Sequence, residues 1–305
     1  MPVLLPRISP LDADAAWRAV LALKTHWRSN VDRGKAQIRV AADGAVSVTT
    51  GGRAPASDVI IEPDGVWQST RPLTADAGQV FDIYLPLCAP DPGRMTAIAH
   101  LGQSLDGRIA THTGNSHYVN GQANILHLHR LRALCDAVLV GAGTVRHDDP
   151  RLTVRHCPGR TGLRAVIDTN LGLDAGRNLF GDGAAPSILY CAEDSRRGRT
   201  KLGDAEIIGL PRAGDWVDVS ALYADLRTRG VRALLIEGGG VTVSRFLAVR
   251  ALTHLQVTIA PVIIGSGRPG IGLPLIDTLA EALRPPTRRF MMGEDVMFEC
   301  RLDGG

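Results

Sequence analysis

The stretch LLIEGGGVTVSRFL, residues 234–247, joins an apolar run to an acid, three glycines and a segment that can form a helix. A strand that leads through glycines into a helix leaves free backbone N–H groups at the helix N-terminus, where the helix dipole favours an anion. Glycine also lets a diphosphate approach the backbone closely. The stretch therefore predicts either a plain strand-to-helix turn or a nucleotide diphosphate site, with Glu237 at its edge as a catalytic or substrate-binding acid.

Two polar segments follow apolar runs elsewhere in the chain. SLDGRIATHTGNSHYVNG (104–121) supplies hydroxyls and one aromatic side chain, and GTVRHDDPRLTVR (143–155) crowds arginines and acids into a short span. Each is either an ordinary solvated loop or a substrate-binding wall, because substrate contacts in α/β folds usually lie in loops at strand ends. Arginines in such a loop can bind a phosphate with two hydrogen bonds. No G-x-G-x-x-G opens a first βαβ unit, so the dinucleotide fingerprint is absent.

The elements that position these segments fall on both sides of a break near residues 88–95, where proline, aspartate and glycine cluster. The preceding part reads as a small α+β module of unknown role, residues 1–93. Its expected elements are a helix over 11–27, hairpins over 37–48 and 58–70, and a strand over 79–87.

After the break, apolar strands alternate with helices, which predicts a three-layer α/β domain over residues 94–305. The strands are continuously apolar and so suit a sheet that is covered on both faces. The expected strands are 95–101, 136–141, 163–169, 187–191, 233–238 and 255–265, with 295–302 as a closing strand. The expected helices are 120–134 and 220–229, the second with Ser220 as its N-cap and Gly230 at its end.

The composition limits the class of protein. The 305 residues are 45% hydrophobic with a net charge of +3, which is too mild to indicate nucleic acid or membrane binding. The five cysteines show no CxxC pair, which argues against a structural zinc site and is typical of reduced thiols in the cytoplasm. The start of the sequence lacks the pattern of a secretory signal. We expect a cytoplasmic homodimer that binds a small molecule.

The motifs SLDGRIA, GNSHYVNG, LRALCDAVLVGAGTVRHDDPRLTVR, AVIDT, ALLIEGGG and APVIIGSG together resemble the reductase domain of the bacterial riboflavin-biosynthesis deaminase/reductase, over residues 95–302. The resemblance implies a dihydrofolate-reductase-like α/β fold with a mixed, mostly parallel central sheet. It also implies NADPH as cofactor and reduction of the ribosyl group of 5-amino-6-(5-phosphoribosylamino)uracil to a ribityl group. No metal is expected.

The resemblance also assigns site residues. Those implied for NADPH are Gly102, Tyr118, Thr144, Asp148, Thr169 and, at the diphosphate, Gly238, Gly239, Gly240, Val241 and Thr242. Those implied for the substrate are Ser116, Arg132, Leu152, Arg155 and Glu237, and we add His100 as a further substrate-binding candidate. Arg132 and Arg155 suit a 5′-phosphate, although Arg132 shares the inward face of its helix and is alternatively a paired core charge. Asp148 and Glu237 are the candidate catalytic acids, unless each only positions its ligand.

The sequence departs from the family pattern in three places. His100 stands where bifunctional members usually carry lysine, and Tyr118 where many carry tryptophan. The zinc deaminase half needs H-x-E and P-C-x-x-C, whereas residues 1–93 contain only Cys88 and His26 as cysteine and histidine. The alternatives are therefore a related NADPH reductase that acts on a diaminopyrimidine or pterin-like substrate, and a nucleotide-binding homologue without catalysis whose added module binds a partner.

Overall fold

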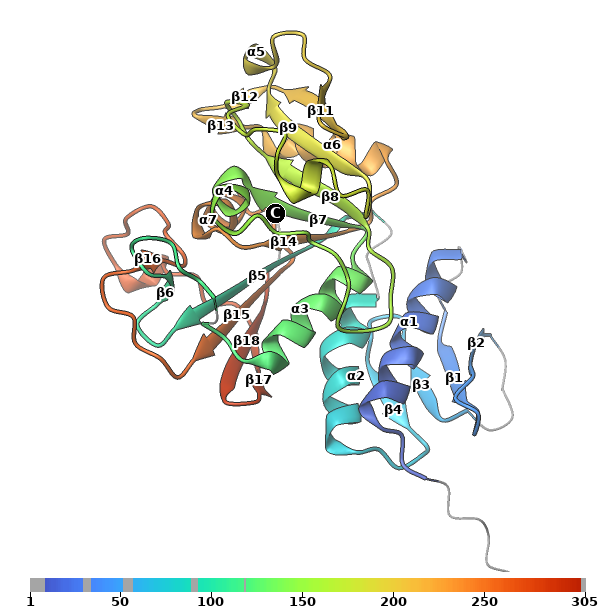
Figure 1. Cartoon of the computed structure of the whole chain (residues 1–305). Coiled ribbons are helices and arrows are strands. Elements are labelled where there is room, and N and C mark those ends of the chain that lie inside the picture. The colour runs from blue at the N-terminus through green and yellow to red at the C-terminus, as the bar shows by residue number, and fades with distance from the viewer. Residues whose placement is uncertain (1–8, 30–33, 52–56, 89–92, 118, 303–305) are drawn as a thin grey trace, which may run out of the picture. The chain divides into compact units, whose positions relative to one another are not determined.

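The computed structural model describes residues 9–29, 34–51, 57–88, 93–117 and 119–302 (Figure 1). The chain divides into two compact units, Met1–Asp91 and Pro92–Gly305. No described helix is both long enough and apolar enough to cross a membrane.

The first unit combines two helices with a four-stranded antiparallel sheet of order β2-β1-β3-β4. Both expected hairpins are confirmed: β1 pairs antiparallel with β2, and β3 with β4. The two helices share an aromatic contact, because the rings of Trp17 and Tyr84 lie 5.2 Å apart in an edge-on arrangement. The elements are α1 (Ala13–Ser29), β1 (Ala36–Val40), β2 (Val46–Thr50), β3 (Val59–Ile61), β4 (Trp67–Ser69) and α2 (Ala75–Cys88).

The strand expected over residues 79–87 is wrong, because this segment belongs to helix α2. Val80, Tyr84 and Cys88 are all buried and recur every four residues, which is the spacing of one helical face. A short apolar run that is rich in aromatic and β-branched residues does not distinguish a strand from a buried helix. Packing within the first unit decides the outcome.

The second unit is built on a ten-stranded sheet of order β10-β11-β9-β8-β7-β14-β5-β15-β18-β17. The strands from β11 to β15 are parallel, and β10, β18 and β17 are antiparallel to their neighbours, so the sheet is mixed and mostly parallel as expected. The strands are β5 (Thr96–Ser104), β7 (Ala137–Gly141), β8 (Leu163–Ile167), β9 (Ser187–Ala192), β10 (Lys201–Leu202), β11 (Ala205–Leu210), β14 (Ala233–Glu237), β15 (His254–Ala260), β17 (Thr287–Met292) and β18 (Asp295–Arg301).

Helices cover both faces of this sheet. Leu234 and Ile236 of β14 pack in one apolar core with Val243 and Phe246 of the helix that follows. The alternate residue Glu237 faces the opposite side, where another helix crosses the sheet (Figure 1). The helices are α3 (Gln122–Leu134), α4 (Ala142–Asp148), α5 (Glu193–Arg196), α6 (Val219–Thr228), α7 (Gly240–Ala248) and the 3-10 turns η1 (Asn178–Phe180) and η2 (Leu279–Glu281).

Local details differ from the expectations in three places. Asp218, not Ser220, caps α6, and its Oδ1 accepts a hydrogen bond of 2.9 Å from the N–H of Ala221. An aspartate one position before the first helical residue reaches that N–H directly. The charged segment 143–155 is not a loop throughout. Its first part lies in helix α4, which begins after the N-cap Gly141, and it becomes a loop only after Asp148. Strand β15 ends at Ala260, five residues earlier than expected.

Candidate active site

The N-termini of α4 and α7 meet at the ends of the neighbouring strands β7 and β14. Gly238 and Gly239 have φ angles of 65° and 67°, a left-handed conformation that glycine adopts without steric cost. A Cβ atom added at Gly239 would lie 3.2 Å from Oγ1 of Thr144 in α4. The first N–H groups of a helix lack partners within the helix. The two helix starts therefore present backbone donors and a threonine hydroxyl to a common point that suits an anion.

Glu237 ends β14 directly before this turn and is ion-paired with Arg132 of α3. Nε and Nη2 of Arg132 donate hydrogen bonds of 2.6 and 2.7 Å to the two carboxylate oxygens. Nη1 of Arg132 donates to the carbonyl oxygen of Thr153 at 3.0 Å, so all three guanidinium nitrogens have partners. Burial lowers the pKa of Arg132, but the charge and the hydrogen bonds of Glu237 outweigh burial and raise it. This is the paired arrangement that the sequence left open for Arg132.

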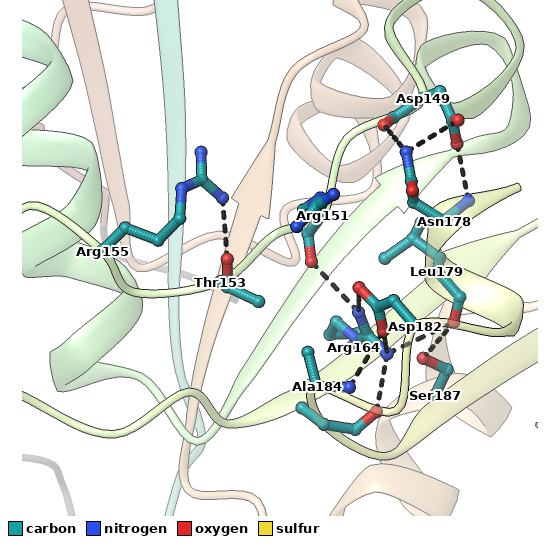
Figure 2. Close-up of polar contacts among 11 residues, drawn as sticks. Asp149, Arg151, Thr153, Arg155, Arg164, Asn178, Leu179, Asp182, Ala184 and Ser187 are labelled. Carbon is teal, nitrogen blue, oxygen red and sulfur yellow. Dashed lines mark hydrogen bonds and ion pairs between the residues drawn. The ribbon is translucent and has the colours of Figure 1, made fainter.

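Arg155 is exposed and belongs to the same group of charges. Its Nη1 donates a 2.7 Å hydrogen bond to Oγ1 of Thr153, the one contact that Figure 2 draws for this guanidinium. Partial burial lowers the pKa of Arg155, the charges of Arg132 and Arg151 lower it further, and Glu237 acts in the opposite direction. The charge of Arg155 is therefore crowded by two other arginines and is only partly offset by Glu237, which favours the binding of an anion.

His100 lies within a row of polar side chains on neighbouring strands of the sheet. Strand pairing places it between Glu237 of β14 and Gln256 of β15. It is buried, and among the described residues no hydrogen bond of standard geometry reaches its ring nitrogens. Its ring lies 5.2 Å from that of His127, whose Nε2 lies 2.8 Å from Oε1 of Gln256. Burial and then His127 lower the pKa of His100 well below its ordinary value, against the influence of Asn124, so the ring is neutral.

The remaining site residues from the sequence lie around this centre. Oγ of Ser116 donates to Oδ1 of Asp148 at 3.3 Å. Leu152 is buried with a left-handed φ of 52°. Thr169, which follows β8, is buried, and no described residue hydrogen-bonds its hydroxyl. Gly102 lies against Asn120, whose Oδ1 a side chain at this position would strike. Tyr118 lies outside the described residues.

At the turn itself, the last three assigned positions differ in exposure. Val241 is exposed, whereas Gly240 and Thr242 are buried. A side chain at Gly240 would strike the carbonyl oxygen of Gly270, so this glycine has a packing role. The structure therefore brings the turn into contact with Thr144 and brings Arg132 together with Glu237, whereas Asp148 contacts Ser116 and not Glu237.

Several residues that the sequence analysis did not select hold the site together. His129 accepts a 2.9 Å hydrogen bond at Nδ1 from the backbone N–H of Arg155. Arg164, inside β8, donates a 3.2 Å hydrogen bond to the carbonyl oxygen of Arg151. A signal for Arg164 was present, because a charge within the apolar run LRAVI needs buried partners.

Comparison with known proteins identifies the family. The family model described as the RibD C-terminal domain matches residues 96–287. The chain belongs to the RibD C-terminal domain family. A 2,5-diamino-6-ribosylamino-4(3H)-pyrimidinone 5′-phosphate reductase from Methanothermobacter thermautotrophicus is 32% identical over 221 residues, which cover 69% of this chain and 100% of that protein. The riboflavin biosynthesis protein RibD of Bacillus amyloliquefaciens is 31% identical over 164 residues, which cover 53% of this chain and 44% of that protein.

Solved structures confirm the fold of RibD-like reductase domains. A deaminase/reductase from Thermotoga maritima superimposes with a TM-score of 0.60 at 22% identity, covering 74% of this chain and 61% of that one. A riboflavin biosynthesis reductase from Saccharomyces cerevisiae gives a TM-score of 0.55 at 22% identity, covering 70% of this chain and 91% of that one. The resemblance found in the sequence is thereby confirmed, including its assignment to a reductase family of riboflavin biosynthesis.

Proposed function

We propose that residues 92–305 form an NADPH-dependent reductase that converts the ribosyl group of a 5′-phosphorylated 6-ribosylaminopyrimidine into a ribityl group. One observation carries the proposal: the buried carboxylate of Glu237, with Arg132 and Arg155 near it, directly precedes the glycine turn between β14 and α7. An anion site for a cofactor and a charged site for a phosphorylated substrate are therefore contiguous. The family of the chain supports the same activity.

The residues present fit a nicotinamide dinucleotide. Gly238 and Gly239 have the left-handed backbone and lack the side chains that would crowd a diphosphate, and the first N–H groups of α7 supply its donors. Thr144 adds a hydroxyl from α4, and Thr242 is a further contact from the first turn of α7. Bound there, NADPH supplies the hydride. In the proposal, Gly102, Thr169 and Tyr118 complete the cofactor site.

On the substrate side, the work of the protein is alignment and electrostatics. Arg155 binds the 5′-phosphate, because its guanidinium is exposed and crowded by other cations. Glu237 accepts hydrogen bonds from the pyrimidine or the ribose, and Arg132 fixes the carboxylate in one orientation. Neutral His100 offers one donor and one acceptor. Ser116 and Leu152 are the further substrate contacts, and Asp148 is the second candidate acid.

Two pyrimidines fit this proposal. The Thermotoga deaminase/reductase is named for a 5-amino-6-(5-phosphoribosylamino)uracil reductase activity. The Methanothermobacter relative and a relative from Archaeoglobus fulgidus, 29% identical over 83% of its length, are named for the 2,5-diaminopyrimidinone. Purified protein should oxidise NADPH with one of these two substrates, with a product that carries two more hydrogens by mass spectrometry. Turnover of a dihydropteridine alone, or NADPH binding without oxidation, would contradict the proposal.

We also propose a homodimer in the cytoplasm. Six exposed apolar side chains lie in and before the edge strand β17: Leu273, Leu275, Ile276, Leu279, Leu283 and Met291. Exposed apolar side chains on and near an edge strand are typical of interfaces, and a second copy is the simplest partner. Light scattering should give twice the chain mass, and the double variant Leu275→Asp, Met291→Asp should give the monomer. A monomeric wild type would refute the dimer. The five cysteines are scattered and include no CxxC pair, which favours a reducing compartment.

A further inference from the structure

The segment of residues 149–155, here called the strap, connects the end of α4 with the loop that leads to β8. It carries two of the proposed substrate contacts, Leu152 and Arg155. Every second residue of the strap is held by a side chain from another element. The pairs are Asp149 with Asn178, Arg151 with Arg164, Thr153 with Arg132, and Arg155 with His129.

We call the side chains that hold the strap its anchors. The first anchor is Asn178 of η1, which holds Asp149 with three hydrogen bonds. The backbone N–H of Asn178 donates to Oδ1 at 2.9 Å, and its Nδ2 donates to Oδ2 at 2.8 Å and to the carbonyl oxygen of Asp149 at 3.2 Å. Asp149 has a left-handed φ of 38°, which ends α4 and turns the chain into the strap. Asn178 therefore fixes the direction in which the strap leaves the helix (Figure 2).

At the second anchor, Arg164 joins the strap to the loop between η1 and β9. Its Nη1 donates to the carbonyl oxygen of Arg151 at 3.2 Å and to Asp182 at 2.9 Å. Its Nη2 donates to the carbonyl oxygens of Leu179 and Ala185 at 3.3 and 2.7 Å. Arg164 is only 1% exposed, and its hydrogen bond to Asp182 lowers the pKa of that acid (Figure 2). A buried charge with this many partners has one fixed position.

The far end of the strap is held by α3. Nη1 of Arg132 donates to the carbonyl oxygen of Thr153, and Nδ1 of His129 accepts from the N–H of Arg155. Burial is the main cause that lowers the pKa of His129 to about 3, followed by the charge of Arg132, so Nδ1 stays free to accept. The two ends of the strap are thus tied to different elements of the second unit.

The strap does not hold its shape by backbone preference alone. Leu152, in its middle, has a φ of 52° and a fully buried side chain. A left-handed conformation is strained for a non-glycine residue and persists only where the surroundings impose it. Residues in such conformations concentrate at ligand sites, where a fixed geometry is required. The anchors on both sides of Leu152 supply that constraint.

We propose that Arg164 and Asn178 are positioning residues for substrate phosphate, which act by holding the strap so that the Arg155 guanidinium stands ready for the anion. The inference rests on the proposed function. It goes beyond that function because it assigns a role to two residues that are not among the proposed substrate contacts. Neither side chain needs to touch the substrate.

The test measures KM, kcat and NADPH affinity for Asn178→Ala and Arg164→Lys. Each variant should raise the KM for the phosphorylated pyrimidine roughly tenfold to a hundredfold, because a displacement of about 1 Å can cost 10²-fold. The kcat and the NADPH affinity should remain close to those of the wild type. Arg229→Lys is the control, since Arg229 is another arginine with several hydrogen bonds, but these go to the side chains of Glu206 and Asp225 and not to the strap. Asn178→Ala keeps the test independent of any folding defect in Arg164→Lys.

Two further comparisons separate positioning from general destabilisation. In an Arg155→Ala background, Asn178→Ala should add no further rise in KM, and substrate that lacks the phosphate should not distinguish the variants from wild type. Equal effects in both backgrounds, or on both substrates, would overturn the inference. Titration with ribose 5-phosphate and ribose separates the two proposals: weaker binding of only the phosphate in the variants supports positioning even if turnover fails. A wild type that binds neither would overturn both.

Discussion

Arg132 and Glu237 form a buried ion pair in which Nε and Nη2 of the arginine reach the two carboxylate oxygens at 2.6 and 2.7 Å. The pair joins α3 to the end of β14, and the third nitrogen of Arg132 holds the strap through Thr153. Each guanidinium nitrogen of Arg132 therefore already has a partner within the protein. Its side chain orients Glu237, and the exposed Arg155 is the cation that we assign to the phosphate.

Replacing Arg132 by alanine should lower the free energy of unfolding by about 3–5 kcal/mol, the usual cost of leaving one buried charge without its partner. The carboxylate of Glu237 has a side-chain exposure of only 8%, so water does not replace the lost partner. Urea denaturation followed by circular dichroism measures the change.

The double variant Arg132→Met, Glu237→Leu is the control for this pair. It removes both charges and should recover most of the lost stability, because apolar replacements of a buried pair are often neutral or stabilising. If Arg132→Ala instead keeps its stability and raises the KM for the phosphorylated substrate alone, Arg132 binds phosphate after all.

Arg155→Ala should raise the KM for the phosphorylated pyrimidine by about tenfold to 150-fold, which corresponds to roughly 1.5–3 kcal/mol for hydrogen bonds to a charged group. NADPH affinity should stay near the wild-type value. Steady-state kinetics with and without the 5′-phosphate measures the difference, and Arg160→Ala, another exposed arginine after the strap, is the control. An equal loss with both substrates would show that Arg155 acts on something other than the phosphate.

Gly239→Val should weaken NADPH binding strongly while the protein still folds. The new side chain would stand at the helix start where donors face the diphosphate, next to Oγ1 of Thr144. Valine also disfavours the left-handed φ of 67°, so a control for that strain is required. Gly214→Val serves, because Gly214 has a φ of 64° in the turn between the short strands β12 (Arg212–Ala213) and β13 (Trp216–Val217), with open space around it. Unchanged NADPH affinity in folded Gly239→Val would remove the diphosphate from this turn.

The sequence could predict features that depend on neighbouring residues. The apolar runs of the parallel sheet and the glycine turn after Glu237 are local patterns, and the structure has most of these strands within three residues of their expected ends, β15 excepted. The helix α2 was mistaken for a strand because a short buried run carries no decisive period. Side-chain pairings were also out of reach, since Arg132 and Glu237 stand 105 residues apart and only the folded chain joins them.

The strap is a second example of side-chain pairings that the sequence alone does not predict. Its residues DPRLTVR were recognisable as part of a motif, but the anchors come from α3, β8 and η1, which no spacing rule connects. Arg164 carried a readable signal, because a charge inside an apolar strand must be paired. Asn178 carried none, since asparagine in a loop is ordinary.

The second unit should lose stability in mild acid, because buried histidines are neutral in the folded state. Burial lowers the pKa of His127 to about 4, with the hydrogen bond to Gln256 opposing and the charge of Arg130 assisting. His254 is lowered to about 4 by burial and by Arg301 and Arg288. In the unfolded chain both titrate near about 6.5. Between these values the unfolded state binds more protons, so the free energy of unfolding falls as the pH falls.

The stability from these groups is fully present above about pH 6.5 and is lost as the pH falls towards about 4, by up to about 3 kcal/mol for His127 at 1.4 kcal/mol per unit. Urea denaturation at several pH values across this window measures the slope. His127→Gln keeps a polar group near Gln256 but cannot titrate, so it should flatten the slope even if the variant is less stable throughout. The same change at the exposed His112 is the control and should leave the slope as in the wild type. An unchanged slope in His127→Gln would mean that this ring does not stay neutral when folded, and the acid sensitivity would then have to come from the carboxylates.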